Sequence, residues 1–170
     1  NNIPRLLFAS SFVVYGDLQK SMNAAIMENS CCKPNSVYGN SKLSCENLLR
    51  VYAEPNGINW NSLRMFNVYG PGQDITKPDQ GLVGIFLNML LKSNVVDVKG
   101  SLDRYRDLVY IDDVIYSWES VLFSGARNLA LNVGSGQKTT FLQLINMIAE
   151  ILGKKDELII NQIEKTPGDI

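Results

Sequence analysis

The chain alternates between short apolar runs and longer stretches in which apolar residues recur at helical spacing. The short runs predict strands at 4–9, 95–99, 108–111 and 129–133, and the alternation of apolar and polar residues at 58–66 predicts another. The longer stretches predict helices at 37–53, 82–92, 112–123 and 141–152. Strands that alternate with helices of this length predict a parallel α/β sheet.

Polar residues mark several ends of these elements. Serines at 10–11 end the first apolar run, and the aspartates at 112–113 are expected to cap the third helix. Thr140 and Gln143 stand at the spacing of a capping box before the last helix. The chain begins within a residue or so of a buried strand. We therefore expect a further region upstream of it, and a strand at 6–9 that lacks a neighbour on one side.

The composition is that of a globular protein without a strongly charged surface. Of 170 residues, 45% are apolar and 19% are charged, and the formal net charge is −1. This balance argues against a surface built for nucleic acid or anionic lipid. The apolar stretches are too short to span a bilayer, and the sequence opens without a signal-peptide pattern. We therefore expect a cytoplasmic protein that binds neither membranes nor nucleic acids.

Histidine is absent, which removes whole classes of chemistry. Ser-His-Asp and Cys-His catalysis and most zinc enzymes need it. The three cysteines, Cys31, Cys32 and Cys45, lack metal-ligand spacing, and we interpret them as reduced thiols. We therefore expect no metal, and acid–base chemistry from Tyr, Lys, Asp, Glu or Cys.

The strongest local signal is the pair Tyr38 and Lys42 in the segment YGNSK. Four residues apart on a helix, the two side chains lie on one face, about one turn from each other. A phenol is a poor base at neutral pH, but an ammonium group beside it stabilises the phenolate. Such a pair can exchange a proton with an alcohol. Alone the pattern is weak, because tyrosine and lysine fall at this spacing by chance on many helices.

Ser10 and Ser11 strengthen this interpretation. They follow a predicted parallel strand at its carboxyl end, where α/β sheets place their ligands. A serine hydroxyl there can hydrogen-bond the alcohol or carbonyl on which Tyr38 acts. The alternative is a serine pair that only starts a turn, completed at 16–17. Residues 64–74 then add a strand end, an amide and a Gly-Pro loop in order.

Six segments occur in a recognisable order along essentially the whole chain. They are ASSFVVYGD (9–17), SVYGNSK (36–42), RMFNVYGPGQ (64–73), RYRDLVYIDDV (104–114), LNVGSG (131–136) and PGDI (167–170). Together they resemble the extended short-chain dehydrogenase/reductase family, and within it the nucleotide-sugar epimerases of the UDP-glucose 4-epimerase type. The resemblance implies an α/β fold with a partial Rossmann-type parallel sheet (its C-terminal half) and a smaller α/β substrate-binding domain.

The resemblance also implies domain bounds. Residues 1–68 correspond to the C-terminal half of the NAD-binding Rossmann domain, with the catalytic serine and the Tyr-x-x-x-Lys pair. Residues 69–170 correspond mainly to the nucleotide-sugar-binding domain, and residues 102–140 partly return to the Rossmann core.

Site residues follow from the same resemblance. Ser11, Tyr38 and Lys42 match the family's catalytic triad. The positions that match NAD contacts are Ser10, Tyr38, Lys42 (at the nicotinamide ribose) and Phe66 (near the nicotinamide). The positions that match nucleotide-sugar contacts are Ser11, Asn67, the backbone around Leu82, Lys99, Arg106 and Lys165.

Arg106 is the match to the family's diphosphate contact, where a planar guanidinium suits phosphate oxygens. The alternative is an ion pair with Asp103 or Asp107 on the same loop.

The chain departs from the family pattern at several points. The strand and G-x-x-G-x-x-G turn that cradle the NAD pyrophosphate in the family are absent, so we expect the pyrophosphate half of the cofactor site to be missing. Phe12 replaces a small residue, and either crowds the sugar pocket or packs inward. Thr166 stands where many relatives carry an arginine that contacts phosphate, with Lys165 one step earlier.

Two positions separate the reactions of the family. Related 4,6-dehydratases carry an acid pair just before their Val-Tyr-Gly, where this chain has Phe12 and Val13, which transfer no proton. Elimination is therefore disfavoured. The resemblance implies NAD-dependent C4 epimerisation of a nucleotide sugar, with UDP favoured, through a 4-keto intermediate in a homodimer.

Two alternatives stay open. One is a nucleotide-sugar dehydratase or another oxidoreductase of the family. The other is a non-catalytic fragment that binds a sugar nucleotide or NAD. In either case we expect the 170 residues alone to be inactive.

Overall fold

The computed structural model describes residues 4–17, 25–77 and 81–164. The chain divides into two compact units. Unit 1 comprises Asn1–Phe66 and Val109–Gly136, and unit 2 comprises Asn67–Leu108 and Gln137–Ile170. Each unit is therefore assembled from segments that are far apart in the sequence.

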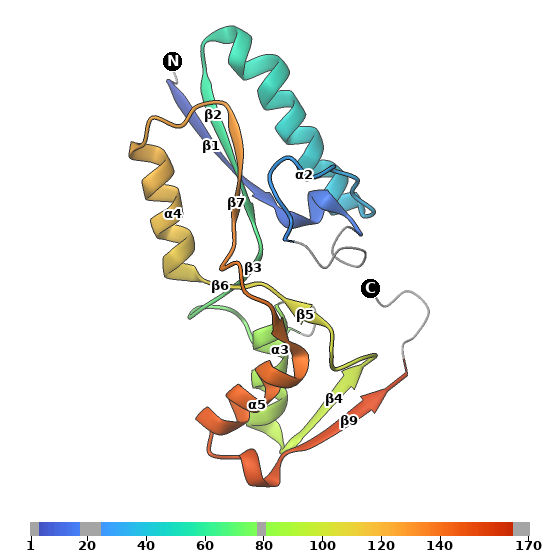
Figure 1. The fold of residues 1–170 in the computed structure, drawn as a ribbon. Helices are drawn as coiled ribbons and strands as arrows, with labels where there is room; N and C mark the ends of the chain where they lie inside the picture. Colours follow the sequence, from blue (N-terminus) through green and yellow to red (C-terminus); the bar gives the residue numbers. More distant parts are fainter. Residues whose placement is uncertain (1–3, 18–24, 78–80, 165–170) are drawn as a thin grey trace. The chain divides into compact units, whose positions relative to one another are not determined.

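Unit 1 is built on a parallel sheet with the strand order β1-β2-β7 (Figure 1). The strands are β1 (Arg5–Ser11), β2 (Asn59–Met65) and β7 (Leu129–Val133). All three coincide with predicted strands. β1 pairs with β2 from its first residue to its last, ending at Ser11 opposite Met65, so the two carboxyl ends are level. Among the described strands, β1 has a single neighbour, β2.

Helix α2 (Val37–Leu48) covers one side of this sheet (Figure 1). It begins after Ser36, whose hydroxyl oxygen accepts a hydrogen bond from Gly39 N at 3.0 Å. The chain continues as a π turn, η2 (Leu49–Ala53), and a 3-10 turn, η3 (Glu54–Asn56). The one long helix predicted here is thus an α-helix with a wider last turn.

Helix α4 (Ile111–Phe123) lies on the other side of the sheet (Figure 1). Its N-cap residue is Tyr110, and no described side chain caps it. The prediction that Asp112 and Asp113 cap this helix is wrong, because β6 (Leu108–Tyr110) runs directly into α4. Both aspartates lie in the first turn instead, where carboxylates interact favourably with the helix dipole.

Unit 2 packs two helices and short strands around one apolar cluster. Its elements are β3 (Asn67–Tyr69), α3 (Leu82–Lys92), β4 (Val95–Lys99), β5 (Tyr105–Arg106), β8 (Thr139–Thr140), α5 (Phe141–Ile151), η4 (Lys155–Glu157) and β9 (Ile159–Ile163). β4 pairs with β9 in parallel, and β5 pairs with β8 in the antiparallel sense. Leu90, Val96 and Ile145 are fully buried in the cluster.

The predicted α/β class with parallel sheets is confirmed. The capping box predicted for α5 is also confirmed, since Thr140 Oγ1 accepts from Gln143 N at 3.1 Å and Gln143 Oε1 accepts from Thr140 N at 2.8 Å. Four short strands, β3, β5, β8 and β9, were not predicted. Within the described ranges, no helix is long and apolar enough to cross a membrane.

Candidate functional site

Two serines end β1 at the carboxyl edge of the unit 1 sheet, and they point in different directions. Ser11 caps the short helix η1 (Phe12–Tyr15), because its hydroxyl oxygen accepts a hydrogen bond from Val13 N at 3.5 Å. A serine hydroxyl both accepts and donates, so Ser11 keeps a proton to donate. Ser10 is turned inward, where its hydroxyl donates to Glu46 Oε1 at 2.5 Å.

Tyr38 and Lys42 stand in successive turns of α2. Lys42 Nζ lies 5.4 Å from the centre of the Tyr38 ring and 5.2 Å from the centre of the Phe8 ring. It also donates a hydrogen bond to the Ala9 carbonyl at 2.9 Å, two residues before Ser11. Tyr38 is 56% exposed, so a bound molecule can reach its ring. The structure thus brings the pair together and ties its lysine to the strand that ends in Ser11.

Gly39 allows α2 to begin close to the segment that follows β1. A Cβ at this position would lie 2.9 Å from Val13 O and 2.9 Å from Pro34 Cβ, closer than side chains tolerate. The helix turn that carries Tyr38 is therefore packed against η1, whose N-cap is Ser11.

A buried ion pair joins α2 to β2. Arg64 donates from Nε and Nη2 to the two carboxylate oxygens of Glu46, at 2.6–3.2 Å. Both side chains are almost completely buried. Burial alone would lower the pKa of Arg64, but its hydrogen bonds to Glu46 and Tyr15 raise that pKa, so the guanidinium stays charged.

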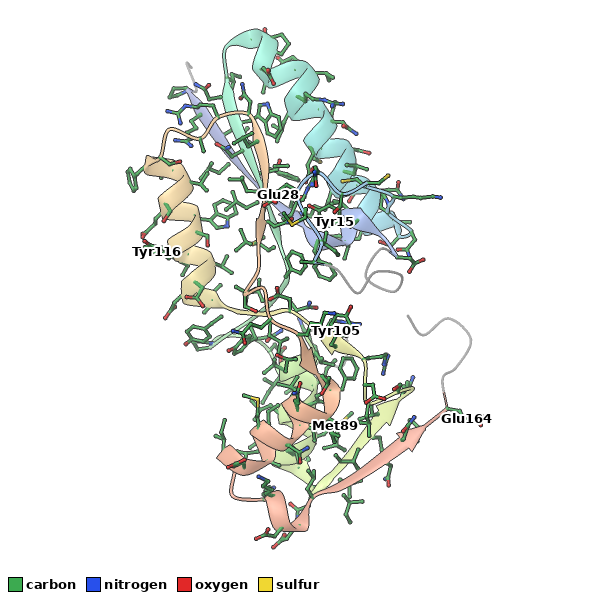
Figure 2. All side chains as sticks on the ribbon, viewed as in Figure 1. Tyr15, Glu28, Met89, Tyr105, Tyr116 and Glu164 are labelled. Carbon is green, nitrogen blue, oxygen red and sulfur yellow. The ribbon has the colours of Figure 1, made fainter. Side chains whose placement is uncertain are left out.

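Tyr15 and Asn132 extend these contacts to β7. Arg64 Nη1 donates to the Tyr15 hydroxyl at 2.8 Å, and that hydroxyl donates to Asn132 Oδ1 at 2.7 Å. Glu28, which lies close to Tyr15 in Figure 2, accepts from Arg64 Nη1 through its backbone oxygen and from Asn132 N through its carboxylate. Burial raises the pKa of Tyr15, although the Arg64 hydrogen bond opposes this. The carboxyl ends of β1, β2 and β7 are thereby linked.

The buried residues Glu46, Arg64 and Tyr15 were not singled out from the sequence. One signal was available, because Glu46 follows Lys42 at the same four-residue spacing that separates Lys42 from Tyr38. All three side chains therefore share one face of α2. The partners of Glu46 on β1 and β2 become visible only with the strand register, which sets Ser10 opposite Arg64.

Phe66, predicted to lie near the nicotinamide, directly follows β2. It stacks on Phe12 with ring centres 5.2 Å apart and planes 16° from parallel. Phe12, the departure from the family's small residue, therefore packs on an aromatic ring of unit 1.

Arg106 lies on β5 of unit 2 in a partly buried position. Its Nη1 donates to the Tyr105 carbonyl at 2.9 Å, and its guanidinium carbon lies 5.4 Å from the centre of the Phe141 ring. Burial lowers the pKa of Arg106, and the neighbouring charge of Arg104 lowers it further. Arg104 was not singled out from the sequence; its guanidinium carbon lies 4.5 Å from the same ring centre.

The other residues predicted to contact the nucleotide sugar have different surroundings. Asn67 donates from its backbone N and from Nδ2 to the Asp107 carbonyl, each at 3.1 Å, so its side chain holds β3 to the segment before β6. Leu82 is the first residue of α3, and Lys99 is the last residue of β4. Lys165 lies outside the described residues. The roles predicted for these side chains, and for Ser10, Ser11, Tyr38, Lys42 and Phe66, stay predictions.

Residues 1–134 match the sequence model of the NAD dependent epimerase/dehydratase family. The chain belongs to this family. It is 34% identical over 156 residues to dTDP-4-dehydro-6-deoxyglucose reductase of Escherichia coli, a match that covers 91% of this chain and 48% of that protein. The resemblance stated from the motifs is confirmed at the level of the family.

Solved structures of the family have the same fold. A UDP-N-acetylglucosamine 4-epimerase from Methanobrevibacter ruminantium, in complex with UDP-N-acetylmuramic acid, superposes with a TM-score of 0.89 at 29% identity, covering 100% of this chain and 53% of that one. A UDP-glucose 4-epimerase of Thermus thermophilus, in complex with NAD, gives 0.80 at 33% identity, covering 98% and 53%. The chain spans about half the length of the relatives it matches.

Proposed function

We propose that this chain carries the catalytic and substrate-binding residues of an NAD-dependent nucleotide-sugar 4-epimerase. The observation that carries the proposal is the Tyr38–Lys42 pair, with Nζ at 5.4 Å from the phenol ring and hydrogen-bonded to the strand that ends in Ser11. Membership of the NAD dependent epimerase/dehydratase family supports the general class of reaction. The structures of sugar-nucleotide epimerases that share the fold support the substrate class.

Tyr38 has the chemistry for proton transfer at a sugar hydroxyl. The exposed Tyr38 side chain, as the phenolate that the Lys42 ammonium stabilises, can take a proton from the 4-hydroxyl, hold it as the phenol and return it later. One of the three Lys42 N–H groups donates a hydrogen bond to the Ala9 carbonyl, which holds the ammonium in place and leaves two N–H groups for a ligand. The Ser11 hydroxyl can donate a hydrogen bond to the same sugar oxygen.

Residues of unit 1 fit the nicotinamide end of NAD. The donor set consists of the Lys42 ammonium and the Tyr38 hydroxyl, and the stacked pair Phe12 and Phe66 directly follows the carboxyl ends of β1 and β2. Lys42 would hold the nicotinamide ribose, and Phe66 would lie near the nicotinamide ring. When bound, the cofactor supplies reversible hydride acceptance. The 170 residues contain no Gly-rich turn of the kind that binds the NAD pyrophosphate. The contacts with NAD that we propose for this chain are therefore those at the nicotinamide end.

Two side chains favour epimerisation over elimination. Removal of water from a sugar needs an additional acid and base, and the chain offers Phe12 and Val13 at the positions that follow Ser11. Phe12 stacks on Phe66, and the Val13 backbone N donates to Ser11, so neither residue presents a group that transfers a proton to a sugar. Epimerisation needs only the Tyr38 proton and the returned hydride.

Arg106 is the proposed diphosphate contact in unit 2. Its charge is partly buried, and Arg104 repels it, so an anion that approaches the guanidinium relieves an unfavourable environment. UDP is the nucleotide we propose, and a hexose is the sugar.

A cytoplasmic homodimer is part of the proposal. Leu48, Val51 and Tyr52 are more than 60% exposed and stand at helical spacing on α2 and η2. Apolar side chains grouped in this way favour contact with another protein surface. Light scattering during size-exclusion chromatography tests this point, and a monomeric mass would contradict it.

The function is tested with the protein at its natural length and NAD. It is incubated separately with UDP-glucose, UDP-N-acetylglucosamine and UDP-glucuronate, and the products are separated by chromatography and identified by NMR. We expect conversion of at least one substrate to its C4 epimer, and no conversion by Tyr38→Phe. A 4-keto-6-deoxy product would show a dehydratase, and a folded protein that converts none of the three would contradict the epimerase proposal.

A further inference from the structure

We propose that Ser10 and Glu46 are positioning residues, which fix α2 on the carboxyl end of β1 and thereby hold Tyr38 and Lys42 in place for catalysis. The catalytic part of this inference rests on the proposed function. Its structural part, the attachment of α2, stands on the contacts of unit 1 alone.

Two neighbouring residues of β1 bind two successive turns of α2. The Ala9 carbonyl accepts from Lys42 Nζ at 2.9 Å, and the Ser10 hydroxyl donates to Glu46 Oε1 at 2.5 Å. Because Lys42 and Glu46 are four residues apart, both contacts lie on the helix face that also carries Tyr38. A rotation or slide of α2 that moves Tyr38 must therefore stretch both contacts.

The Glu46 carboxylate is itself held from a second strand. Arg64 of β2 binds both of its oxygens, and the parallel register sets Arg64 opposite Ser10. The Arg64 guanidinium is held in turn by the Tyr15 hydroxyl and the Glu28 carbonyl. Ser10 and Arg64 thus fix the position of the carboxylate with respect to two strands at once.

Stability alone gives a weak reason for this arrangement. Removing two charges from water is costly, and a buried ion pair often contributes little more than apolar side chains of similar volume would. What a buried, fully bonded pair provides is a defined geometry. Here that geometry fixes the helix turns adjacent to Lys42, where small displacements of reacting groups reduce the rate strongly.

Ser10→Ala is the sharpest probe, because it deletes one hydroxyl and leaves the Glu46–Arg64 pair in place. Ser62→Ala is a matched control. Ser62 is completely buried on the adjacent strand β2, and its hydroxyl has no hydrogen-bond partner within the described parts of the chain. Both variants lose one buried hydroxyl, and only Ser10→Ala removes a contact to α2.

The first measurement is hydrogen–deuterium exchange by mass spectrometry on the natural-length protein. Opening of a helix that has lost an anchor exposes its amides more often. We expect faster exchange in peptides from α2 in Ser10→Ala than in Ser62→Ala, with β2 unchanged in both. Equal exchange in α2 would overturn the attachment of the helix, whatever the enzymatic activity.

The second measurement is steady-state kinetics with NAD and the nucleotide sugar that the unmodified protein converts. Ser10→Ala should lower kcat on the order of ten- to a hundred-fold and leave both KM values unchanged, and the isotope effect with substrate deuterated at C4 should rise. Ser62→Ala should match the unmodified protein. A raised KM for NAD would show instead that Ser10 contacts the cofactor directly, and an unchanged kcat would remove the positioning role.

The two levels of the inference fail separately. If the unmodified protein converts no nucleotide sugar, the proposed function fails, and the exchange experiment still decides whether Ser10 and Glu46 anchor α2. If it does convert one, the kinetics of the two serine variants decide the positioning role.

Discussion

Arg106 holds a positive charge in a partly buried place, where burial and Arg104 both lower its pKa. One of its five N–H groups donates to the Tyr105 carbonyl. A hydrogen bond to a charged group contributes roughly 1.5–3 kcal/mol. Arg106→Ala should therefore raise the KM for the nucleotide sugar by about ten- to a hundred-fold, with a smaller effect on kcat. Steady-state kinetics on the natural-length protein checks this.

Arg127→Ala is the control for that measurement. Arg127 is an exposed arginine of unit 1 that donates to the Ser124 and Ala126 carbonyls, and its removal should leave the KM unchanged. An unchanged KM in a folded Arg106→Ala protein would contradict the diphosphate role and weaken the proposed substrate class.

Tyr38→Phe should have the opposite kinetic effect. Phenylalanine keeps the ring that lies 5.4 Å from Lys42 Nζ and removes only the hydroxyl that exchanges the proton. Turnover should fall by at least about a hundred-fold, the usual contribution of a positioned acid–base group, while nucleotide-sugar affinity by calorimetry stays the same. Substantial turnover by Tyr38→Phe would assign proton transfer to another residue.

At the scale of single residues, the sequence predicted what depends on local spacing. Tyr38 and Lys42 share a helix, so their proximity follows from the helical repeat alone. The Glu46–Arg64 pair was not predicted, because it depends on where α2 lies against β2. The stacking of Phe12 on Phe66 likewise needs the strand ends to be level, and the sequence left two alternatives for Phe12.

At the scale of elements, helix ends also divide into those set by local sequence, which were predicted, and those set by tertiary contacts, which were not. The capping box of α5 uses residues three apart and was predicted correctly. The start of α4 was predicted at the wrong residues, because the preceding strand β6 ends without an intervening loop. Its other end is held by Arg5 of β1, which donates to carbonyls of the last turn and beyond, including Ser124 and Ala126. A contact across more than a hundred residues leaves no local pattern.

Thr140→Ala tests the α5 capping box. The change removes the acceptor for Gln143 N and should lower the free energy of unfolding by about 0.5–2 kcal/mol. Thr140→Ser keeps the hydroxyl and should recover most of the loss. Urea denaturation of the three proteins measures the difference, and equal stability of the alanine and serine variants would show that the cap contributes nothing.

The short strands β3, β5, β8 and β9 of unit 2 are the strands that the sequence did not predict. β5 and β8 have two residues each, too few for an alternating pattern. β9 is largely exposed and includes Asn161 and Gln162, so its pairing with β4 depends on the tertiary arrangement rather than on its own sequence. The strands β1 and β7, by contrast, were found from their apolar runs, because helices cover both faces of the parallel sheet in unit 1.

At the scale of the whole chain, each unit has its own buried side chains. The apolar cluster of α3, α5 and β4 belongs entirely to unit 2, whereas both tryptophans, Trp60 and Trp118, belong to unit 1. The fluorescence of Trp60 and Trp118 therefore reports on unit 1, and exchange of amides in α5 reports on unit 2. The stabilities of the two units can be measured separately in one protein.

Ile145→Ala should destabilise unit 2 selectively. Ile145 is completely buried between the helices and strands of the cluster, and truncation of such a residue costs about 2–5 kcal/mol. We expect faster amide exchange in α3 and α5, and a smaller change in the Trp fluorescence midpoint during urea unfolding. Ile145→Val, which removes one methyl group, should lower the free energy of unfolding by about 0.5–1.5 kcal/mol. It too should change amide exchange in unit 2 more than the Trp fluorescence midpoint. Equal shifts of both signals in Ile145→Ala would show instead that the units unfold as one cooperative body, so that substitutions in unit 2 would also destabilise the unit that carries Tyr38.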